Sequence, residues 1–146
     1  MDKLLQLLSK NADLSNAQLA EMLGETETAV ANARAAYEKS GVIRGYQALI
    51  NWNLLQDEYL EAFIEVTITP KADQGFEGVA EIIAGFDEVE SVYLISGGYD
   101  LMVTVAGKSF HEVAMFVAKR LSPLESVTST STHFVLRRYK KDGVLL

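Results

Sequence analysis

The sequence predicts an α+β protein in two parts, and three observations support this. Up to Tyr46, apolar residues recur with helical spacing between capping residues. From Leu60 onward, segments with the spacing of strands alternate with segments that have the spacing of helices. Two β-branched runs flank the diglycine Gly97-Gly98. We therefore expect a helix-turn-helix (winged-helix-like) domain followed by a ferredoxin-like β-α-β-β-α-β domain. The expected parts are the first domain at 1–46, a linker strand at 47–58 and the second domain at 59–146.

Two short helices are expected before Gly24. Leucines one turn apart indicate a first helix that closes near residues 11–13. The second helix begins at Ser15, three residues before Gln18, which is the spacing of a capping box, and Gly24 is suited to end it. The residues expected to face inward are Leu4, Leu5, Leu8, Leu19, Ala20 and Leu23.

A third helix is capped by Thr26, runs to about Ser40 and ends at Gly41, with Val30, Ala33 and Tyr37 facing inward. The tight turn that leads into this helix gives a helix-turn-helix pattern. The residues from Val42 to Tyr46 predict the start of a strand or small wing. Periodicity alone equally allows a small bundle for dimerisation or packing. Between the domains, Trp52 is expected to pack rather than to form an exposed binding platform.

The second domain begins with a half-buried strand in which Leu60, Ala62, Ile64, Val66 and Ile68 alternate with polar residues. A helix, two strands joined at the diglycine turn, a second helix and a last strand from Val127 to Tyr139 follow. The second helix opens with a capping box, Ser109 to Glu112. The residues expected on the buried faces of the two helices are Phe76, Val79, Ala80, Ile83, Phe86, Phe110, Val113, Ala114, Val117 and Leu121.

Such a sheet has helices on one face only, and its central hairpin carries apolar residues on both sides. A monomer would expose a large apolar patch, and such patches usually become interfaces. We therefore expect two copies to pair sheet to sheet, with further assembly.

The turn between the two central strands has the composition of a binding site. Gly97 and Gly98 can adopt a positive φ, which would reverse the chain and direct successive N–H groups at an anion. Asp100 can meet a cation, and the ring of Tyr99 can cover both. A free amino acid presents this pair of charges. The alternative is a plain hairpin turn with a solvated Asp100.

These residues resemble the Lrp/AsnC family, the feast/famine transcription regulators of bacteria and archaea, over nearly the whole chain. In the first domain the resemblance is carried by Leu14-Ser15, Leu19-Ala20, Leu23-Gly24, Val30 and Gly41-Val42-Ile43-Arg44-Gly45-Tyr46. In the second it is carried by Ser96-Gly97-Gly98-Tyr99-Asp100 and Thr130-Ser131-Thr132.

The resemblance implies a DNA-binding domain joined to an effector-sensing domain, called RAM, and dimers assembled into an octamer-like ring. It implies amino-acid effectors bound between neighbouring dimers. We expect no cofactor. The implied effector-binding residues are Ser96, Gly97, Gly98, Tyr99 and Asp100, with Thr130 and Thr132 completing the pocket from a neighbouring subunit.

The third helix departs from the family pattern because Ala33 stands where a basic residue is common, and Arg34 and Lys39 are its only cations. Each cation that neutralises a phosphate adds to affinity through counterion release, so few such contacts are expected. Arg34 can read a base, or it can pack against the bundle and pair with Glu38. The expected DNA-binding residues are Thr26, Thr28, Asn32, Arg34 and Lys39.

The charge distribution also predicts weak attraction to the phosphates of DNA. The net charge is −7, but the chain up to Trp52 holds five basic and six acidic residues, so only −1 falls there and −6 on the rest. Negative charge repels a phosphate backbone at long range. A regulator that binds DNA is therefore one hypothesis, and an amino-acid sensor or assembly protein with weak or lost DNA binding is the alternative.

Other kinds of function have less support. The chain has no cysteine, and nothing gathers His111 and His133 with other ligands into a metal site. The sequence offers neither an activated nucleophile nor a buried acid–base pair, so nothing in it points to an enzyme. The basic run from Arg137 to Lys141 is expected to be a solvated strand end. No apolar run approaches the roughly 20 residues that span a bilayer, and no signal peptide is evident, so we expect a cytoplasmic protein with no membrane partner.

Overall fold

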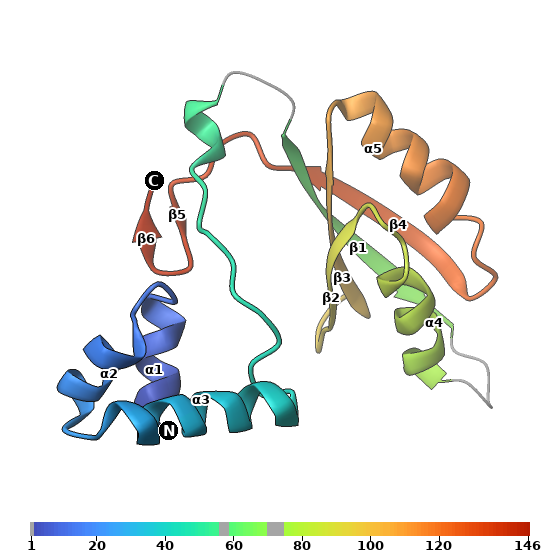
Figure 1. Ribbon diagram of the computed structural model, residues 1–146. Helices are drawn as coiled ribbons and strands as arrows, with labels where there is room; N and C mark the ends of the chain where they lie inside the picture. The colour runs from blue at the N-terminus through green and yellow to red at the C-terminus, as the bar shows by residue number, and fades with distance from the viewer. Residues whose placement is uncertain (1, 56–58, 70–74) are drawn as a thin grey trace. The chain divides into compact units, whose positions relative to one another are not determined.

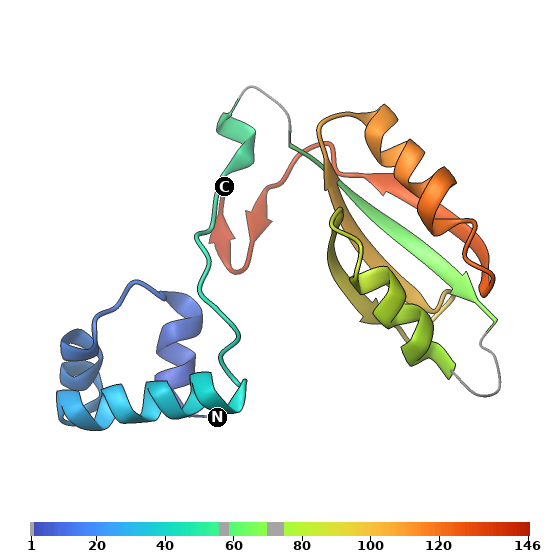
Figure 2. The same cartoon turned by 45° about the vertical axis from the view of Figure 1, so that its right-hand side comes forward.

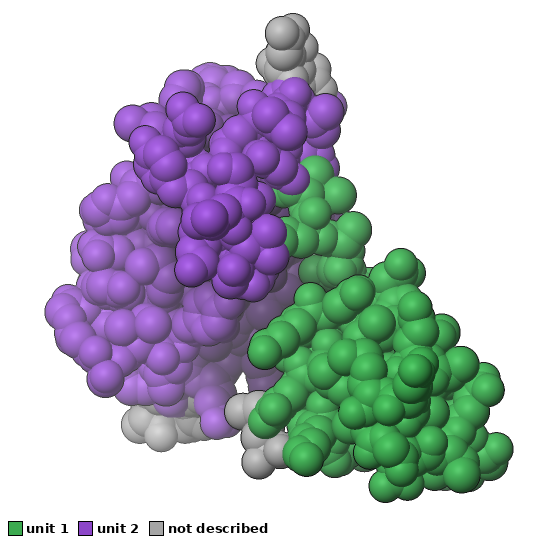
Figure 3. Space-filling model, turned by 90° about the vertical axis from the view of Figure 1, so that its left-hand side faces the viewer, with its two compact units in different colours: residues 1–50 green, residues 51–146 purple. Residues whose placement is uncertain are grey.

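The computed structural model describes residues 2–55, 59–69 and 75–146. The chain divides into two compact units, residues 1–50 and residues 51–146, which Figure 3 distinguishes by colour. No helix within the described ranges is long and apolar enough to cross a membrane.

The N-terminal unit consists of three helices, α1 (Lys3–Lys10), α2 (Asn16–Leu23) and α3 (Glu27–Ser40) (Figure 1). The predicted caps are confirmed. Ser15 and Gln18 form a reciprocal capping box at α2, and Thr26 Oγ1 accepts a hydrogen bond from Ala29 N at 3.1 Å. Gly24 and Gly41 end their helices with φ of +69° and +78°, a region that glycine enters without strain.

The core of this unit is small and apolar. Its buried members are Leu4, Leu8, Leu19, Ala20 and Val30, with Leu23, Ala33 and Tyr37 packed around them, as predicted. Leu5, which was also expected to face inward, is only half-buried and is not part of this core. The hydroxyl of Tyr37 donates to Asp2 Oδ2 at 2.7 Å, joining α3 to the cap of α1. This bond, more than the N–H groups that Asp2 also caps, holds the pKa of the Asp2 carboxyl below its ordinary value.

Two predictions about the region after α3 are wrong. No strand or wing forms at Val42 to Tyr46, and the described linker residues, 47–55, contain no strand. The chain instead runs extended to a single 3₁₀ turn, η1 (Trp52–Leu54). A strand needs a neighbouring strand for its backbone hydrogen bonds, and these residues have none within the unit.

The C-terminal unit has the predicted β-α-β-β-α-β order. Its antiparallel sheet runs β2-β3-β1-β4. Helices α4 (Gly75–Ala84) and α5 (Phe110–Phe116) lie on the same face of the sheet (Figures 1 and 2). The strands are β1 (Leu60–Ile68), β2 (Val89–Leu94), β3 (Leu101–Gly107) and β4 (Val127–Phe134).

The core of the C-terminal unit lies between this sheet and its helices. From Ala62 onward β1 alternates as predicted, with Ala62, Ile64, Val66 and Ile68 at most 5% exposed. At the start of the strand the alternation fails, because Leu60 is only partly buried and Glu61 is 7% exposed. The other buried members are Val79, Ile83, Leu101, Val103, Val105, Val113, Phe116 and Leu121.

The buried face predicted for α5 is partly wrong. Phe110 and Ala114 are exposed, whereas Phe116 is 5% exposed and belongs to the core. The helix changes into a π-turn, η2 (Val117–Leu121), whose widened spacing is seen in the hydrogen bond from Ser122 N to Val117 O at 2.8 Å. The misassigned residues precede this turn, in regular α-helix, and Leu121 within the turn is buried as predicted. Phe116 follows Val113 by three residues, so helical spacing allows this face as well as the predicted one, and packing against the sheet selects it. The capping box also differs, because Glu112 Oε2 accepts from Lys108 N and not from Ser109 N.

The last strand is shorter than predicted. β4 ends at Phe134, and the chain continues extended into a small hairpin of β5 (Lys140–Lys141) and β6 (Val144–Leu145). Asp142 and Gly143 form its turn, both with positive φ. This is the Asp-Gly pattern of a two-residue type I′ hairpin.

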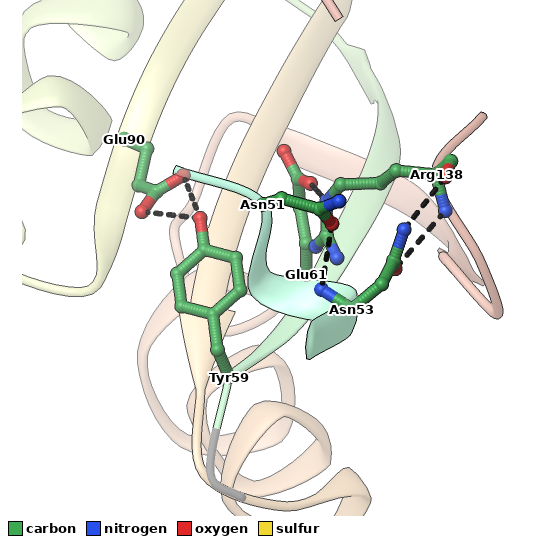
Figure 4. A network of polar contacts seen from close by, with 6 residues as sticks. All are labelled: Asn51, Asn53, Tyr59, Glu61, Glu90 and Arg138. Atoms are coloured by element: carbon green, nitrogen blue, oxygen red, sulfur yellow. Dashed lines mark hydrogen bonds and ion pairs between the residues drawn. The ribbon is translucent and has the colours of Figure 1, made fainter. Parts of the chain in front are cut away.

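A polar network joins the extended segment after β4 to the start of the sheet (Figure 4). Arg138 Nε pairs with Glu61 Oε2 at 2.7 Å, and both side chains are about nine-tenths buried, at 10% and 9% exposure. The side-chain amide of Asn53 donates to Arg138 O at 2.7 Å. Arg138 is therefore not part of a solvated strand end. Glu61 lies on the helix-free face of β1, as its alternation with Ala62 requires, but Arg138 covers it there.

Trp52 belongs to the same corner of the C-terminal unit. Its ring stacks on Tyr59, with centroids 4.5 Å apart and planes 15° apart. The hydroxyl of Tyr59 donates to the carboxylate of Glu90 at 3.0 Å (Figure 4). Burial first, and this bond second, raise the pKa of Tyr59 above its ordinary value.

Candidate functional site

The β2–β3 turn, residues 95–100, is closed by the sheet itself. Ile95 N donates to Asp100 O at 2.8 Å, and Asp100 N donates to Val66 O at 3.0 Å. The carboxylate of Asp100 also accepts a hydrogen bond from Ile68 N, with Oδ2 at 2.8 Å. Asp100 is thus half-buried and tied to β1, so the alternative of a merely solvated carboxylate does not hold.

The glycines of the turn do not behave as predicted. Neither Gly97 nor Gly98 has a positive φ, so the turn of six residues reverses without a left-handed glycine. What both positions offer is space. A Cβ at Gly98 would meet nothing within 4 Å, and one at Gly97 would meet only Ile95 Cγ2, at 3.9 Å. The backbone of the turn is therefore open to another molecule.

The seven candidate effector-binding residues form two groups within one chain. Ser96, Gly97 and Gly98 are exposed at the turn, next to the half-buried Tyr99 and Asp100. Thr130 and Thr132 lie on the edge strand β4, opposite Val66 and Ile64 of β1, and so face the helix side of the sheet. β1 lies between β3 and β4, so the two groups are at least two strand spacings, roughly 10 Å, apart within one chain.

The helix-free face of the sheet carries a partly apolar surface. Phe63 and Tyr93 are 39% and 55% exposed there. A groove of about 390 Å³ passes over this face, lined among others by Phe63, Tyr93, Met102 and Thr104. His133 and Glu65 share the face, with Nε2 3.5 Å from Oε2. The described residues contain no group of three side chains that could hold a metal ion, and His111 is an exposed residue of α5.

The candidate DNA-binding residues lie on α3, with Thr26 at its cap. Thr28, Asn32 and Lys39 are exposed, and Thr28 and Asn32 are one turn apart on the same side of the helix. Asn is suited to adenine in the major groove, and Lys to phosphate.

Arg34 is held by other residues of the same unit. Its Nε donates to the hydroxyl of Tyr46 at 2.8 Å, and its Nη1 donates to Leu14 O at 3.4 Å and to Asn16 Oδ1 at 3.3 Å. Nε also lies 3.7 Å from Glu38 Oε1. Of the two alternatives for this residue, these contacts support packing and pairing over base recognition. The sequence signal was present in the spacing of Arg34 and Glu38, but nothing local pointed to Tyr46.

Two protein-family models match the chain. The Lrp/AsnC ligand binding domain matches residues 61–145, and a winged helix-turn-helix DNA-binding domain matches residues 3–44.

Relatives match over almost the full length. The uncharacterised HTH-type transcriptional regulator YugG of Bacillus subtilis is 44% identical over 97% of this chain and 86% of its own, and LrpA of Pyrococcus abyssi, an HTH-type transcriptional regulator, is 31% identical over 94% of each. Among solved structures, the L-Met complex of the transcriptional regulator NMB0573 from Neisseria meningitidis superposes with a TM-score of 0.75, at 26% identity, over 97% of this chain and 93% of that one. This chain therefore belongs to the Lrp/AsnC family of transcriptional regulators, with a helix-turn-helix domain and a ligand-binding domain.

Proposed function

We propose that this regulator binds DNA through α3 and binds an amino acid at the β2–β3 turn, between dimers of a larger assembly. The observation that carries the proposal is the turn itself. Its backbone is open at Gly97 and Gly98, and its carboxylate is held in place by Ile68 N. We assign the carboxylate of the effector to the backbone N–H groups of the turn and its ammonium group to Asp100, at the oxygen that does not bind Ile68.

Assembly supplies the remaining contacts in this proposal. Phe63, Tyr93 and Met102 on the helix-free face support pairing of two sheets, because apolar surface of this kind is stabilised by burial. Thr130 and Thr132 lie on an edge strand, which can approach another dimer, and they are separated from the turn of their own chain. A neighbouring copy is therefore the source of the two threonines, in a ring of dimers that resembles an octamer.

DNA binding through α3 rests on Thr28, Asn32 and Lys39. A regulator that binds chromosomal DNA acts in the cytoplasm, which is where we place this one. A second candidate function is favoured by one observation: Arg34 is held within its own unit, so Lys39 alone remains on α3 for phosphate. That candidate is an amino-acid sensor or assembly protein with weak DNA binding.

Two measurements test the proposal. A thermal-shift screen of the twenty amino acids, starting with L-methionine, should reveal at least one ligand that raises the melting temperature, since a ligand of the folded state stabilises it. A mobility-shift series with DNA from upstream of the protein's own gene should give saturable binding that weakens with salt. If none of the amino acids raises the melting temperature, the sensing function is contradicted. If the protein does not bind this DNA at low salt, the second candidate is favoured.

A further inference from the structure

The guanidinium group of Arg34 lies where three parts of the N-terminal unit meet. It contacts the loop before α2 through Leu14 O, the first residue of α2 through Asn16 Oδ1, and the segment that leaves the unit through Tyr46. The side chain is 21% exposed. We call residues 44–50, which have no regular secondary structure, the exit segment.

Tyr46 is the point at which the exit segment is attached to α3. Its hydroxyl accepts from Arg34 Nε at 2.8 Å and donates to Glu38 Oε1 at 2.7 Å. Its ring lies under the guanidinium, with Arg34 Cζ 4.7 Å from the ring centroid. Arg34 and Glu38 are one turn apart on α3, so one tyrosine engages both.

This arrangement uses the hydrogen-bonding capacity that a DNA-reading arginine would need. Reading guanine takes two N–H donors in one plane, but Nε and Nη1 of Arg34 already have acceptors within the unit. The bond from Nε to Tyr46, at 2.8 Å, is the short one, and a hydrogen bond from a charged donor is stronger than one between neutral groups, so releasing it for DNA would be unfavourable.

We propose that Arg34 is a positioning residue, and that Arg34, Tyr46 and Glu38 transmit a displacement of the exit segment to the recognition helix α3. The second half rests on the proposed function, because it supplies the route by which effector binding alters DNA affinity. A ligand shifts an equilibrium only through a two-state element that both sites bias, and the attachment of Tyr46 to α3 is that element.

The first test asks whether Arg34 touches phosphate. Binding of the wild type, Arg34→Ala and Lys39→Ala to DNA from upstream of the protein's own gene is measured across a salt series. Removing a phosphate contact lowers the salt slope by about 0.9, which we expect for Lys39→Ala. Arg34→Ala should weaken binding with an unchanged slope. A slope lowered by about 0.9 in Arg34→Ala overturns the assignment.

The second test uses variants that keep α3 intact, in case Arg34→Ala fails to fold. Tyr46→Phe removes only the hydroxyl, Glu38→Gln keeps an acceptor for it, and Tyr37→Phe is the matched control, because it removes a hydroxyl that binds Asp2 and not the exit segment. DNA affinity is measured with and without an equimolar mixture of the twenty amino acids. A wild-type response in the usual range of about 5- to 150-fold should fall to within about twofold in Tyr46→Phe and persist in the other two.

The outcomes separate this inference from the proposed function. A wild-type response that Tyr46→Phe retains in full overturns the transmission through Tyr46 and leaves the proposed function standing. A wild-type chain that binds DNA but ignores the amino acids overturns the sensing function and the transmission together, while the salt series still decides the role of Arg34. If the wild-type chain fails to bind this DNA at every salt concentration, both this inference and the DNA-binding part of the proposed function are overturned.

Discussion

Asp100 Oδ2 accepts a hydrogen bond from Ile68 N at 2.8 Å, which joins the β2–β3 turn to the end of β1. The ladder between β1 and β3 ends at the pair of Val66 and Leu101, so Ile68 has no partner on that strand. On the other side, the register with β4 shifts between Thr67 and Ile68. The carboxylate therefore satisfies an N–H group that the sheet leaves over, in addition to any role toward a ligand.

The two roles of Asp100 can be separated by substitution. Asp100→Asn keeps an oxygen that can accept from Ile68 N, so stability should change by less than about 1 kcal/mol, whereas Asp100→Ala leaves the N–H group unsatisfied and should cost about 1–3 kcal/mol. Both should lose effector affinity by about tenfold or more, since the charged partner of the ammonium group is gone. Chemical denaturation and calorimetry with the amino acid found in the thermal-shift screen measure these effects.

The control for Asp100→Asn is Asp87→Asn, which removes one exposed acid at the turn between α4 and β2. It should leave effector affinity unchanged. Undiminished affinity in Asp100→Asn would show that the carboxylate has only its structural role.

A methyl group at position 98 should block the ligand without harming the fold. Nothing lies within 4 Å of a Cβ there and φ is not positive, so Gly98→Ala should leave stability unchanged or raise it by up to about 1 kcal/mol. Effector affinity should fall, because the methyl group occupies the approach to the backbone. Gly45→Ala, also with open space at its Cβ, is the matched control in the other unit. Full affinity in Gly98→Ala would place the effector elsewhere.

The ion pair of Glu61 and Arg138 should be sensitive to the loss of either partner. Arg138→Ala leaves Glu61 buried and uncompensated, and the expected cost is about 3–5 kcal/mol in the free energy of unfolding. The double variant Glu61→Met, Arg138→Met should recover much of this loss, particularly because Nη2 of Arg138 is buried without a hydrogen-bond partner among the described residues.

The contrast is the exposed pair of Arg120 and Glu88, at 2.7 Å with side chains 45% and 32% exposed. Arg120→Ala should cost less than about 1 kcal/mol, since solvent screens such pairs. Similar losses from Arg120→Ala and Arg138→Ala in urea unfolding would contradict the assignment of a buried pair.

Tyr59 should make the protein lose stability in alkali. Its pKa is raised in the folded state by burial and by Glu90, so the unfolded chain releases this proton first, near the ordinary value of about 10. The contribution is complete below that pH and is lost as the pH rises through it toward the folded pKa. Between about pH 8 and 11 the melting temperature should therefore fall less steeply with pH for Tyr59→Phe than for the wild type. Tyr139→Phe, whose residue is 73% exposed, controls for the removal of one phenol, and parallel curves for wild type and Tyr59→Phe would refute the prediction.

Long elements with a clear period were predictable, and irregular ones were not. The capping box at Ser15 and the alternation along β1 follow from neighbours within a few residues, and both are present. The buried face of α5 was misjudged at Phe116, because helical spacing allows neighbouring faces of a helix and packing against the sheet selects one of them. The wing and the linker strand were misjudged for a related reason, since a strand is decided by its partner.

Three features can be inferred without coordinates, because they depend on residues close together along the chain: the order of the elements, the capped ends of the N-terminal helices and the composition of the β2–β3 turn. The partners of the charged side chains, by contrast, are set by the folded chain. Asp100 finds Ile68 32 residues away, Arg34 finds Leu14 20 residues away, and Arg138 finds Glu61 77 residues away. A charged side chain takes the partner that folding brings to it, since burying it unpaired is unfavourable, and no local pattern records that partner.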